Sequence, residues 1–334
     1  MEEAALDTLF LPLDRGEIDI PDRSLFLRAR LHPFLAQLPG LVCQQSFRPW
    51  HDALAARNIA IEEAPQGGYP LVLFLPTKQR DETLAGFARA FDLCAPGGTV
   101  LCAMSNTLGA SRFEAQMKSL AGEVGSLSKN KCRAFWARRT DALDQEVLAE
   151  WRDLDKPRPI LDGQFVSRPG LFSWDRVDTG SALLARHLPE ELKGKGAELG
   201  CGWGFLADAI LKSCPKVKSL DLYEAEKLAL DAAQTNLAGR ETPLRFFWAD
   251  ATQGLEGGPY DFIVTNPPFH QGRADEAALG QGFIRASAKA LKKGGWLLLV
   301  ANRHLPYEEV LRAAFYRTET IAEEGGYKIL RGVK

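Results

Sequence analysis

The sequence lacks the features that would place it in a membrane or build it around a metal. No apolar run approaches the ~18–20 residues that a membrane-spanning helix needs, and the first ten residues, MEEAALDTLF, are acidic, unlike a signal or transit peptide. The six cysteines contain no CxxC pair, which favours free thiols in a reducing compartment over disulfides or a zinc site. We therefore expect a cytoplasmic protein with no membrane segment and no metal.

An excess of charge of one sign is also missing. The chain has 41 Lys and Arg against 43 Asp and Glu, a net charge of −2, so no global basic field indicates nucleic acid. The phosphate-loop pattern GxxxxGK[ST], the zinc-protease pattern HExxH and the hydrolase pattern GxSxG are all absent. These absences exclude several chemistries without indicating one.

The length of the chain predicts two domains. Its 334 residues correspond to about two domains at roughly 100–200 residues each. The clearest break in composition is AEWRDLDKPRPI at residues 149–160, which is charged, contains two prolines and shows little apolar periodicity. We therefore predict one domain at residues 1–155 and a second at residues 156–334.

The C-terminal half alternates between strand-like and helix-like segments. Strands are expected at residues 196–200, 217–224, 244–249, 260–265 and 295–301, and helices at 205–212, 225–237 and 282–291. Strand–helix–strand alternation at this spacing predicts an α/β fold with a mostly parallel, doubly wound sheet.

Three segments of the first half resemble three segments of the second half in the same order. They are residues 69–76 with 260–267, residues 96–104 with 293–301, and residues 131–138 with 327–334. Apolar strands resemble one another, so each match alone carries little weight. Together they predict that one α/β domain occurs twice in the chain.

A glycine run follows the first predicted strand of the second half. It reads Glu198-Leu-Gly200-Cys-Gly202-Trp-Gly204 and leads into a predicted helix. Glycines there let the backbone approach a ligand closely, and the helix N-terminus presents free N–H groups. Glu224 ends the next strand 20 residues after Gly204, where an acidic residue can accept the ribose hydroxyls of a nucleoside cofactor.

The details of this run favour S-adenosylmethionine over a dinucleotide. The pattern is GxGxG, not GxGxxG, and Glu198 precedes the first glycine by two residues. Glu198 can hold an ammonium group or order the loop, and the run can also be a plain turn without a ligand. Asp250, after the third strand, stands where an adenine amino group needs an acceptor, although it also reads as an ordinary helix cap.

A rigid turn, Asn266-Pro267-Pro268-Phe269, follows the fourth strand of the second half. Two prolines fix the backbone, so the Asn266 side-chain oxygen and the Pro267 carbonyl can face one amino group. Two acceptors on a planar amino group favour a pyramidal nitrogen that attacks a methyl donor, and Phe269 can stack on an extruded base. His270 is expected near the surface or behind the site, not as a general base, and the tetrapeptide can also be a plain turn.

Four segments together carry a family resemblance. They are residues 170–184, 198–204, 266–270 and 300–307. The chain resembles the bacterial ribosomal RNA (guanine-N2) methyltransferases, with the small-subunit, RsmC-like type nearest and the large-subunit type next. The resemblance implies two tandem class I S-adenosylmethionine-dependent methyltransferase domains. Each would be Rossmann-like with a mostly parallel seven-stranded sheet, and only the C-terminal one would bind the cofactor.

The same resemblance implies roles for individual residues. The implied catalytic residues are Asn266, Pro267 and Phe269. The implied cofactor-binding residues are Glu198, Gly200, Gly202, Gly204, Glu224, Asp250, Asp178 and Gly180. Trp203 departs from the family, because a small residue is usual between these glycines.

The first half is expected to have lost both functions. When residues 41–47 are aligned with residues 199–205, larger side chains replace the glycines: Val42, Gln44 and Ser46. The alignment of residues 69–76 with 260–267 puts Leu75 in the place of Asn266, and leucine offers no acceptor. The first half then stabilises the fold or holds RNA.

One basic run in the first half has two interpretations. Its members are Lys129, Lys131, Arg133, Arg138 and Arg139. They can contact RNA phosphates, or they can belong to a solvated strand whose charges are balanced by the acidic residues that follow.

The sequence therefore predicts a monomeric enzyme that uses S-adenosylmethionine to methylate the exocyclic N2 of a guanosine in ribosomal RNA, most readily 16S RNA. Its partner would be ribosomal RNA or the small ribosomal subunit. The alternatives are a large-subunit guanine-N2 methyltransferase, a protein glutamine N5-methyltransferase and a non-catalytic RNA-binding assembly factor. Phe in place of Tyr at position 269 and the inactive tandem domain disfavour the glutamine enzyme.

Overall fold

The structure is a computed structural model that describes residues 2–268 and 273–334. The chain divides into two compact units. The N-terminal unit comprises residues 1–156 with 168–170, and the C-terminal unit comprises residues 157–167 with 171–334. Residues 149–152 of the expected linker form the end of a helix.

The N-terminal unit contains a sheet of seven strands in the order β3-β2-β1-β4-β5-β7-β6. β7 alone runs antiparallel to its neighbours. The strands are β1 (Ser24–Leu27), β2 (Leu41–Gln44), β3 (Ala60–Ile61), β4 (Tyr69–Phe74), β5 (Cys94–Ser105), β6 (Gly125–Lys129) and β7 (Cys132–Arg138). The helices are α1 (Glu2–Asp14), α2 (Arg48–Ala55), α3 (Arg80–Leu93), α4 (Ala110–Ala121) and α5 (Gln145–Arg152), with short turns η1 (Pro33–Gln37) and η2 (Asn106–Leu108).

The C-terminal unit repeats this arrangement in the order β12-β11-β10-β13-β14-β16-β15, and a small ribbon, β8 (Arg158–Ile160) with β9 (Phe165–Ser167), precedes it. The strands are β10 (Lys193–Leu199), β11 (Lys216–Glu224), β12 (Leu244–Trp248), β13 (Tyr260–Thr265), β14 (Leu291–Asn302), β15 (Arg317–Glu324) and β16 (Tyr327–Val333). The helices are α6 (Thr179–Arg186), α7 (Phe205–Ser213), α8 (Lys227–Asn236), α9 (Arg273–Ala290) and α10 (Glu308–Ala314), with the turn η3 (Ala251–Gln253). The predicted α/β fold with two mostly parallel seven-stranded sheets is confirmed.

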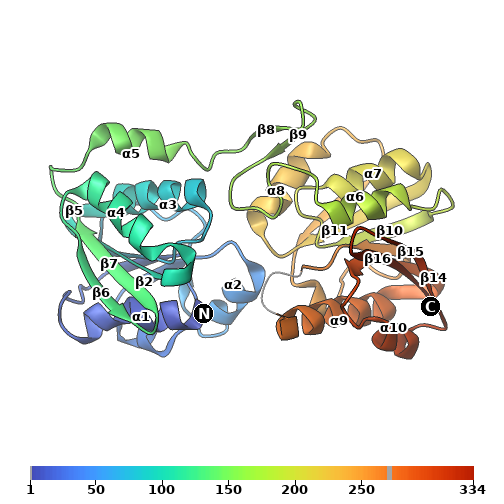
Figure 1. Cartoon of the computed structure of the whole chain (residues 1–334), viewed down its shortest axis with the longest axis horizontal. Coiled ribbons are helices and arrows are strands. Elements are labelled where there is room, and N and C mark those ends of the chain that lie inside the picture. The colour runs from blue at the N-terminus through green and yellow to red at the C-terminus, as the bar shows by residue number, and fades with distance from the viewer. Residues whose placement is uncertain (1, 269–272) are drawn as a thin grey trace. The chain divides into compact units, whose positions relative to one another are not determined.

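The helices cover both faces of each sheet, as Figure 1 shows for α6, α7 and α8 against α9 and α10. Alternate strand residues therefore enter different cores. Leu222 and Leu298 pack with α6, α7 and α8, whereas Tyr223 and Leu299 pack with α9 and α10. A sheet buried on both faces needs continuous apolar strands, and this is why the central strands were readable from the sequence.

The strand registers test the predicted repeat. Thr99 pairs with Leu71 in β4, and Trp296 pairs with Phe262 in β13, so the first two segment matches are confirmed. Thr99 also pairs with Arg138, and Trp296 pairs with Val333. The third match, which aligned Arg138 with residue 334, is therefore wrong by one residue. A one-residue slip in a strand exchanges its two faces.

Helix α9 begins well before the predicted start at residue 282. Glycine lowers helix propensity, and Gly280 and Gly282 made the first half of this helix look like a loop. A Cβ at Gly280 would lie 1.8 Å from the Tyr307 hydroxyl. This glycine is therefore explained by close packing inside the helix and does not mark its end.

Candidate active site

The predicted site residues gather at the carboxyl edge of the C-terminal sheet, where β10, β11 and β13 end. In the sheet β10 lies between β11 and β13, so the connections diverge here, which is where open α/β sheets bind their ligands. A pocket at this edge is lined by residues that include Asp178, Glu198, Gly200, Gly202 and Asn266.

The glycine loop needs its glycines for two different reasons. Gly200, Gly202 and Gly204 have φ angles of +71°, +54° and +93°, which strain residues with a side chain. A Cβ at Gly202 would meet nothing within 4 Å, whereas one at Gly204 would lie 3.3 Å from Ala233 in α8. Gly202 therefore borders open space where a ligand can approach, and Gly204 allows α7 to start close against α8.

Glu224 connects the end of β11 to the glycine loop. Its Oε2 atom accepts a hydrogen bond from the Gly202 amide at 2.8 Å, and its Oε1 atom accepts one from the Glu226 amide at 2.9 Å. Burial raises the pKa of this carboxyl group above its usual value. The group is thus held rigidly at the loop, and its remaining lone pairs can accept ligand hydroxyls.

Glu198 is the most unusual group in the pocket. Its side chain is 1% exposed, the Ala207 amide in α7 donates to it, and its Oε2 atom has no partner in the described part of the chain. Burial and the nearby Glu224 raise the pKa of the Glu198 carboxyl well above its usual value. The buried Glu198 and the half-buried Glu224 have no described cation partner, which favours a positively charged ligand.

Asn266 has a fully bonded amide nitrogen and an unbonded amide oxygen. Its Nδ2 atom donates to Asp178 Oδ2 at 2.9 Å and to Ser181 Oγ at 2.8 Å. Its Oδ1 atom is buried and has no partner among the residues that the structure describes. The rigid Pro267 follows, while Phe269 and His270 lie outside the described residues. The pocket thus contains an acceptor of the kind that an amino group would bind.

Asp178 contacts the Asn266 side chain, and Gly180 follows two residues later in the first turn of α6. Asp178 caps α6, because its Oδ2 atom accepts from the Ser181 amide at 2.9 Å. A Cβ at Gly180 would lie 3.1 Å from that same Oδ2 atom and from the Tyr327 ring. Ser181 was missed in the sequence, and its signal was its position three residues after the capping Asp178.

Asp250 is not among the residues that line the pocket. Asp250 caps η3 by accepting from the Thr252 amide at 2.9 Å and the Thr252 hydroxyl at 2.7 Å. The structure therefore agrees with the second interpretation of Asp250, that of an ordinary helix cap. Its contact with adenine stays a prediction.

The large Trp203 side chain fits between the glycines because its ring packs against Phe165 in strand β9. The ring is 5% exposed and packs edge-on against Phe165, with 5.1 Å between centroids. Its Nε1 atom donates to the Ser173 carbonyl at 3.3 Å. Trp203 therefore anchors the loop to the segment that precedes α6.

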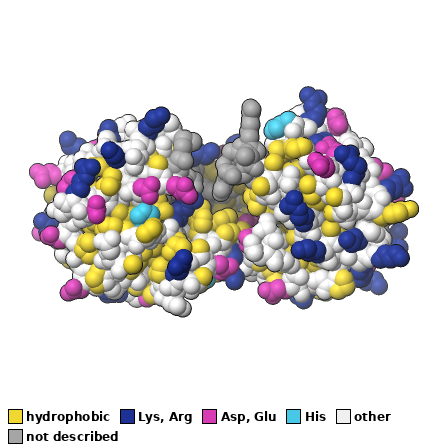
Figure 2. All heavy atoms as spheres, turned by 90° about the horizontal axis from the view of Figure 1, so that it is seen from below, with side chains coloured by type: hydrophobic (Ala, Val, Ile, Leu, Met, Phe, Trp, Pro, Cys, Tyr) yellow, Lys and Arg dark blue, Asp and Glu magenta, His cyan; other side chains and the backbone are white. Residues whose placement is uncertain are grey.

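The five basic residues predicted to bind RNA lie at the two ends of β7. Lys129 and Lys131 flank the β6–β7 turn beside Arg133, which forms an ion pair with Glu114. At the other end, Arg138 and Arg139 donate to backbone carbonyls. On the face of this unit seen in Figure 2, basic and acidic side chains are interspersed. RNA contact by these residues stays a prediction.

The N-terminal counterpart of the glycine loop is not the segment predicted above. Residues 41–44 form β2, whose position in the sheet matches β11, so the alignment of residues 41–47 with the glycine loop is wrong. Leu27 in β1 pairs with Phe74, as Leu199 in β10 pairs with Thr265. Residues 28–31 therefore stand in the place of the loop, and Arg28 keeps a positive φ of 56°. The same register confirms Leu75 in the place of Asn266.

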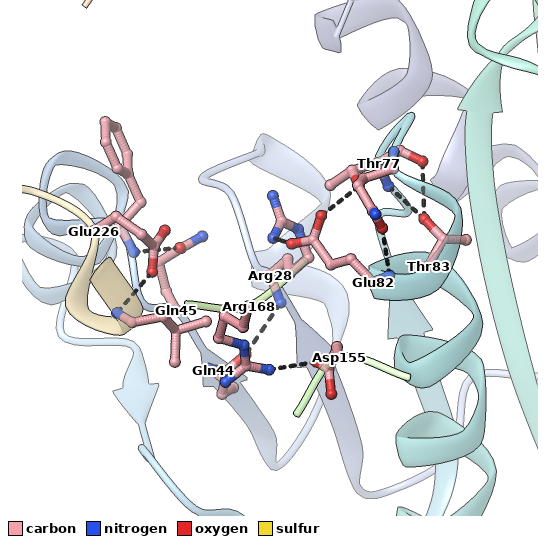
Figure 3. Close-up of polar contacts among 12 residues, drawn as sticks. Arg28, Gln44, Gln45, Thr77, Glu82, Thr83, Asp155, Arg168 and Glu226 are labelled. Atoms are coloured by element: carbon pink, nitrogen blue, oxygen red, sulfur yellow. Dashed lines mark hydrogen bonds and ion pairs between the residues drawn. The ribbon is translucent and has the colours of Figure 1, made fainter. Parts of the chain in front are cut away.

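The side chains at this edge of the N-terminal unit bind one another (Figure 3). Arg28 Nη1 donates to Glu82 Oε1 at 2.7 Å, and Thr77 Oγ1 donates to Glu82 Oε2 at 2.5 Å. Gln45 stands in the place of Glu224. Its oxygen accepts from the Phe47 amide at 2.8 Å and its nitrogen donates to the Ala29 carbonyl at 2.6 Å. This edge thus satisfies its polar groups internally.

Two features are absent from the described residues. None of the helices there is long and apolar enough to cross a membrane. Within the same residues, no group of three or more His, Cys, Asp or Glu side chains is arranged to hold a metal ion.

Comparisons with known proteins agree on one family. Residues 162–331 match the family model of the methyltransferase small domain. The ribosomal RNA small subunit methyltransferase C of Serratia proteamaculans is 30% identical over 78% of this chain and 73% of that protein. The protein of the same name from Psychromonas ingrahamii is 29% identical over 78% of this chain and 74% of its own length.

One solved structure is similar to this chain over nearly its whole length. It is the T. thermophilus 16S rRNA N2 G1207 methyltransferase in complex with AdoMet and guanosine. It covers 99% of this chain with 91% of its own length, at a TM-score of 0.81 and 22% sequence identity. At this identity the match establishes the fold of the whole chain, which is that of tandem class I methyltransferase domains.

Proposed function

The chain belongs to the methyltransferase small domain family and, within it, to the ribosomal RNA small subunit methyltransferases C. From this premise we propose that it transfers a methyl group from S-adenosylmethionine to the exocyclic N2 of a guanosine in small-subunit ribosomal RNA. The observation that carries the proposal concerns Asn266, which lines the same pocket as Glu198 and the glycine loop. Its Oδ1 atom is buried and has no partner among the described residues.

The pocket suits S-adenosylmethionine in shape and in charge. The open side of Gly202 gives a ligand access to the loop backbone. The cofactor carries a sulfonium and an ammonium group. Two carboxyl groups, the buried Glu198 and the half-buried Glu224, offer the opposite charge when ionised. Glu224 would also accept ribose hydroxyls. When bound, S-adenosylmethionine supplies an electrophilic methyl group.

Asn266 and Pro267 would act on the substrate nitrogen. The guanine amino group has two hydrogens, one for the Asn266 Oδ1 atom and one for the Pro267 carbonyl. Both acceptors are held in place before the reaction, so they stabilise the positive charge that develops on the nitrogen as it gains the methyl group. The nitrogen then loses one proton to water, and no titrating base is required.

We extend the proposal to the rest of the chain. Residues 156–334 would be the catalytic domain, and residues 1–155 a degenerate domain that binds no cofactor and supports the fold or the RNA. The exposed members of its basic run are Lys129, Lys131 and Arg138. Arg138 donates to the Gly97 carbonyl, so Lys129 and Lys131 are the first candidates for phosphate contact. The protein would act as a monomer in the cytoplasm on ribosomal RNA or on the small subunit.

Transfer of a labelled methyl group tests the proposal. Small-subunit RNA from cells that lack this gene is incubated with the protein and labelled S-adenosylmethionine, and the modified nucleoside is identified after digestion. N2-methylguanosine at one position is the expected product. Label in protein would indicate the glutamine methyltransferase instead, and a protein without measurable S-adenosylmethionine binding would be an assembly factor.

A further inference from the structure

The amide of Asn266 can take only one orientation in this pocket. Its nitrogen lies 2.9 Å from Asp178 Oδ2 and 2.8 Å from Ser181 Oγ. A carboxylate accepts hydrogen bonds and donates none, so the opposite orientation would set the Asn266 oxygen against the Asp178 oxygen. Both amide hydrogens are therefore used. The Oδ1 atom of this pocket-lining residue is buried without a partner in the described residues.

Helix α6 holds both partners of this amide. A single atom, Asp178 Oδ2, accepts from the Ser181 backbone amide at the start of α6 and from the Asn266 side chain. The helix is fixed in turn by Leu183 and Leu184, which are 2% and 0% exposed. The helix cap and the amide orientation thus depend on the same carboxylate.

The lack of a side chain at Gly180 leaves room for the Asp178 carboxylate beside Asn266. A Cβ there would lie 3.1 Å from Asp178 Oδ2 and 3.1 Å from the Tyr327 ring, closer than most real contacts. A side chain at position 180 would therefore displace the Asp178 carboxylate from Asn266. This accounts for the glycine without any direct contact with a ligand.

We propose that Asp178 and Ser181 are positioning residues, which hold the Asn266 amide with its oxygen toward the amino group that is methylated. The inference rests on the methyl transfer proposed above. The negative charge of Asp178 also polarises the amide through its N–H group, which makes the Asn266 oxygen a stronger acceptor as positive charge develops on the substrate nitrogen. A freely turning amide would present its own hydrogens to an amino group half of the time and repel it.

Asp178→Asn is the main test, because asparagine caps a helix as well as aspartate does. We expect kcat to fall by about 10- to 100-fold, which is less than the loss of the Asn266 acceptor itself. The KM values for S-adenosylmethionine and RNA should stay within about threefold, since binding contacts are retained. Ser181→Ala should lower kcat by about 3- to 10-fold, the size of one neutral hydrogen bond, and Ser181→Thr should restore most of it.

The matched control is Asp175→Asn, which changes a half-exposed aspartate on the preceding turn that pairs with Arg176 at the surface. It should leave kcat and the melting temperature unchanged. The decisive measurement is the double variant Asp178→Asn with Asn266→Ala, which should be no slower than Asn266→Ala alone. Additive losses would overturn the proposal, as would a raised KM for S-adenosylmethionine with an unchanged kcat.

A second measurement is independent of the reaction. The side-chain amide hydrogens of Asn266 should exchange slowly with solvent in the wild-type protein, as observed by nitrogen-15 NMR, and rapidly in Asp178→Asn and Ser181→Ala. If the RNA product were not N2-methylguanosine, the proposed function would fail while this protection persisted. Rapid exchange in the wild type would contradict the positioning role itself.

Discussion

The two units share a strand order and differ in how the polar groups at one edge of the sheet are satisfied. In the C-terminal unit, Glu198 Oε2 and Asn266 Oδ1 are buried there without a partner in the described residues. At the same edge of the N-terminal unit, Arg28, Thr77 and Glu82 bind one another. Buried polar groups normally find partners within the protein. The fold therefore supplies the same sheet edge in both units, and this edge is a candidate binding site only where its buried polar groups lack partners.

The backbone after the first central strand also differs between the two units. The glycine loop leads into α7, a helix of nine residues whose first turn donates to Glu198. The loop at residues 28–31 leads into η1, a turn of five residues. Pro33 opens η1 and has no N–H group, and the Phe34 amide is used by the His32 side chain. The element that follows β1 therefore offers no counterpart of the N-terminus of α7.

The largest effect should come from copying the N-terminal residue into the active unit. Asn266→Leu gives the catalytic turn the residue that stands at Leu75. We expect kcat to fall by about 10²- to 10³-fold, because one preorganised acceptor is lost. S-adenosylmethionine affinity should change little, and isothermal titration would measure it. Activity within tenfold of wild type would mean that the turn is structural.

The reverse exchange serves as the control. Leu75→Asn places a polar group at a position that is 9% exposed. It should restore no activity to an Asn266→Leu protein and should cost about 1–3 kcal/mol of unfolding free energy, because the amide lacks arranged partners. Rescue of methylation by this change would show that the N-terminal edge retains a functional site.

A smaller effect should follow from copying Gln45 into the place of Glu224. Glu224→Gln removes a charged acceptor, so S-adenosylmethionine affinity should fall by about 10- to 100-fold, the size of a hydrogen bond to a charged group. The protein without cofactor should become more stable, because a partly desolvated carboxyl group with a raised pKa is replaced by a neutral one. Thermal melting with and without cofactor measures both changes, and unchanged affinity would exclude Glu224 from the cofactor site.

The sequence predicted the fold because its central strands are apolar throughout and its turns carry glycine and proline. It also predicted Glu198, Glu224 and Asn266, since each stands at the end of a predicted strand. All three reach the same edge of one sheet. Local pattern and strand order were sufficient for that much.

The remainder depends on contacts between distant parts of the chain. Strand β1 has only four residues, Ser24–Leu27, and no glycine run after it, so the glycine loop was aligned with the end of β2 instead of the end of β1. The bond between Asn266 and Ser181 joins residues 85 positions apart. Ser181 stands three residues after the capping Asp178, but no local pattern predicts that its side chain meets Asn266 over such a distance.

The affinity for S-adenosylmethionine should depend on pH, because the C-terminal edge contains the Glu198 carboxyl group. In the protein without cofactor, burial and Glu224 raise the pKa of Glu198, so Glu198 keeps a proton above its usual pKa. A cationic ligand favours the ionised carboxylate, and binding then releases that proton. S-adenosylmethionine affinity should therefore rise with pH between the usual and the raised pKa, by at most about tenfold per pH unit.

The same shift predicts a loss of stability. The folded protein without cofactor holds one more proton than the unfolded chain in this range of pH, so its unfolding free energy should fall as the pH rises. Glu198→Gln should remove both dependences. A wild-type affinity that is flat from pH 5 to pH 9 would show that Glu198 does not meet the charge of the cofactor.

The smallest effect on catalysis is expected from breaking the ion pair between Arg28 and Glu82 at the edge of the N-terminal sheet. Glu82→Gln takes the carboxylate from Arg28, and the two side chains are only 15% and 29% exposed. The unfolding free energy should fall by about 1–3 kcal/mol, because the guanidinium loses a charged partner, while kcat and cofactor affinity stay unchanged. Asp81→Asn on the same helix, which breaks a surface pair with Arg80, should change stability by less than about 1 kcal/mol. A Glu82→Gln protein with normal stability and lowered kcat would instead place the N-terminal edge in the reaction, because a purely structural ion pair cannot slow the chemistry without weakening the fold.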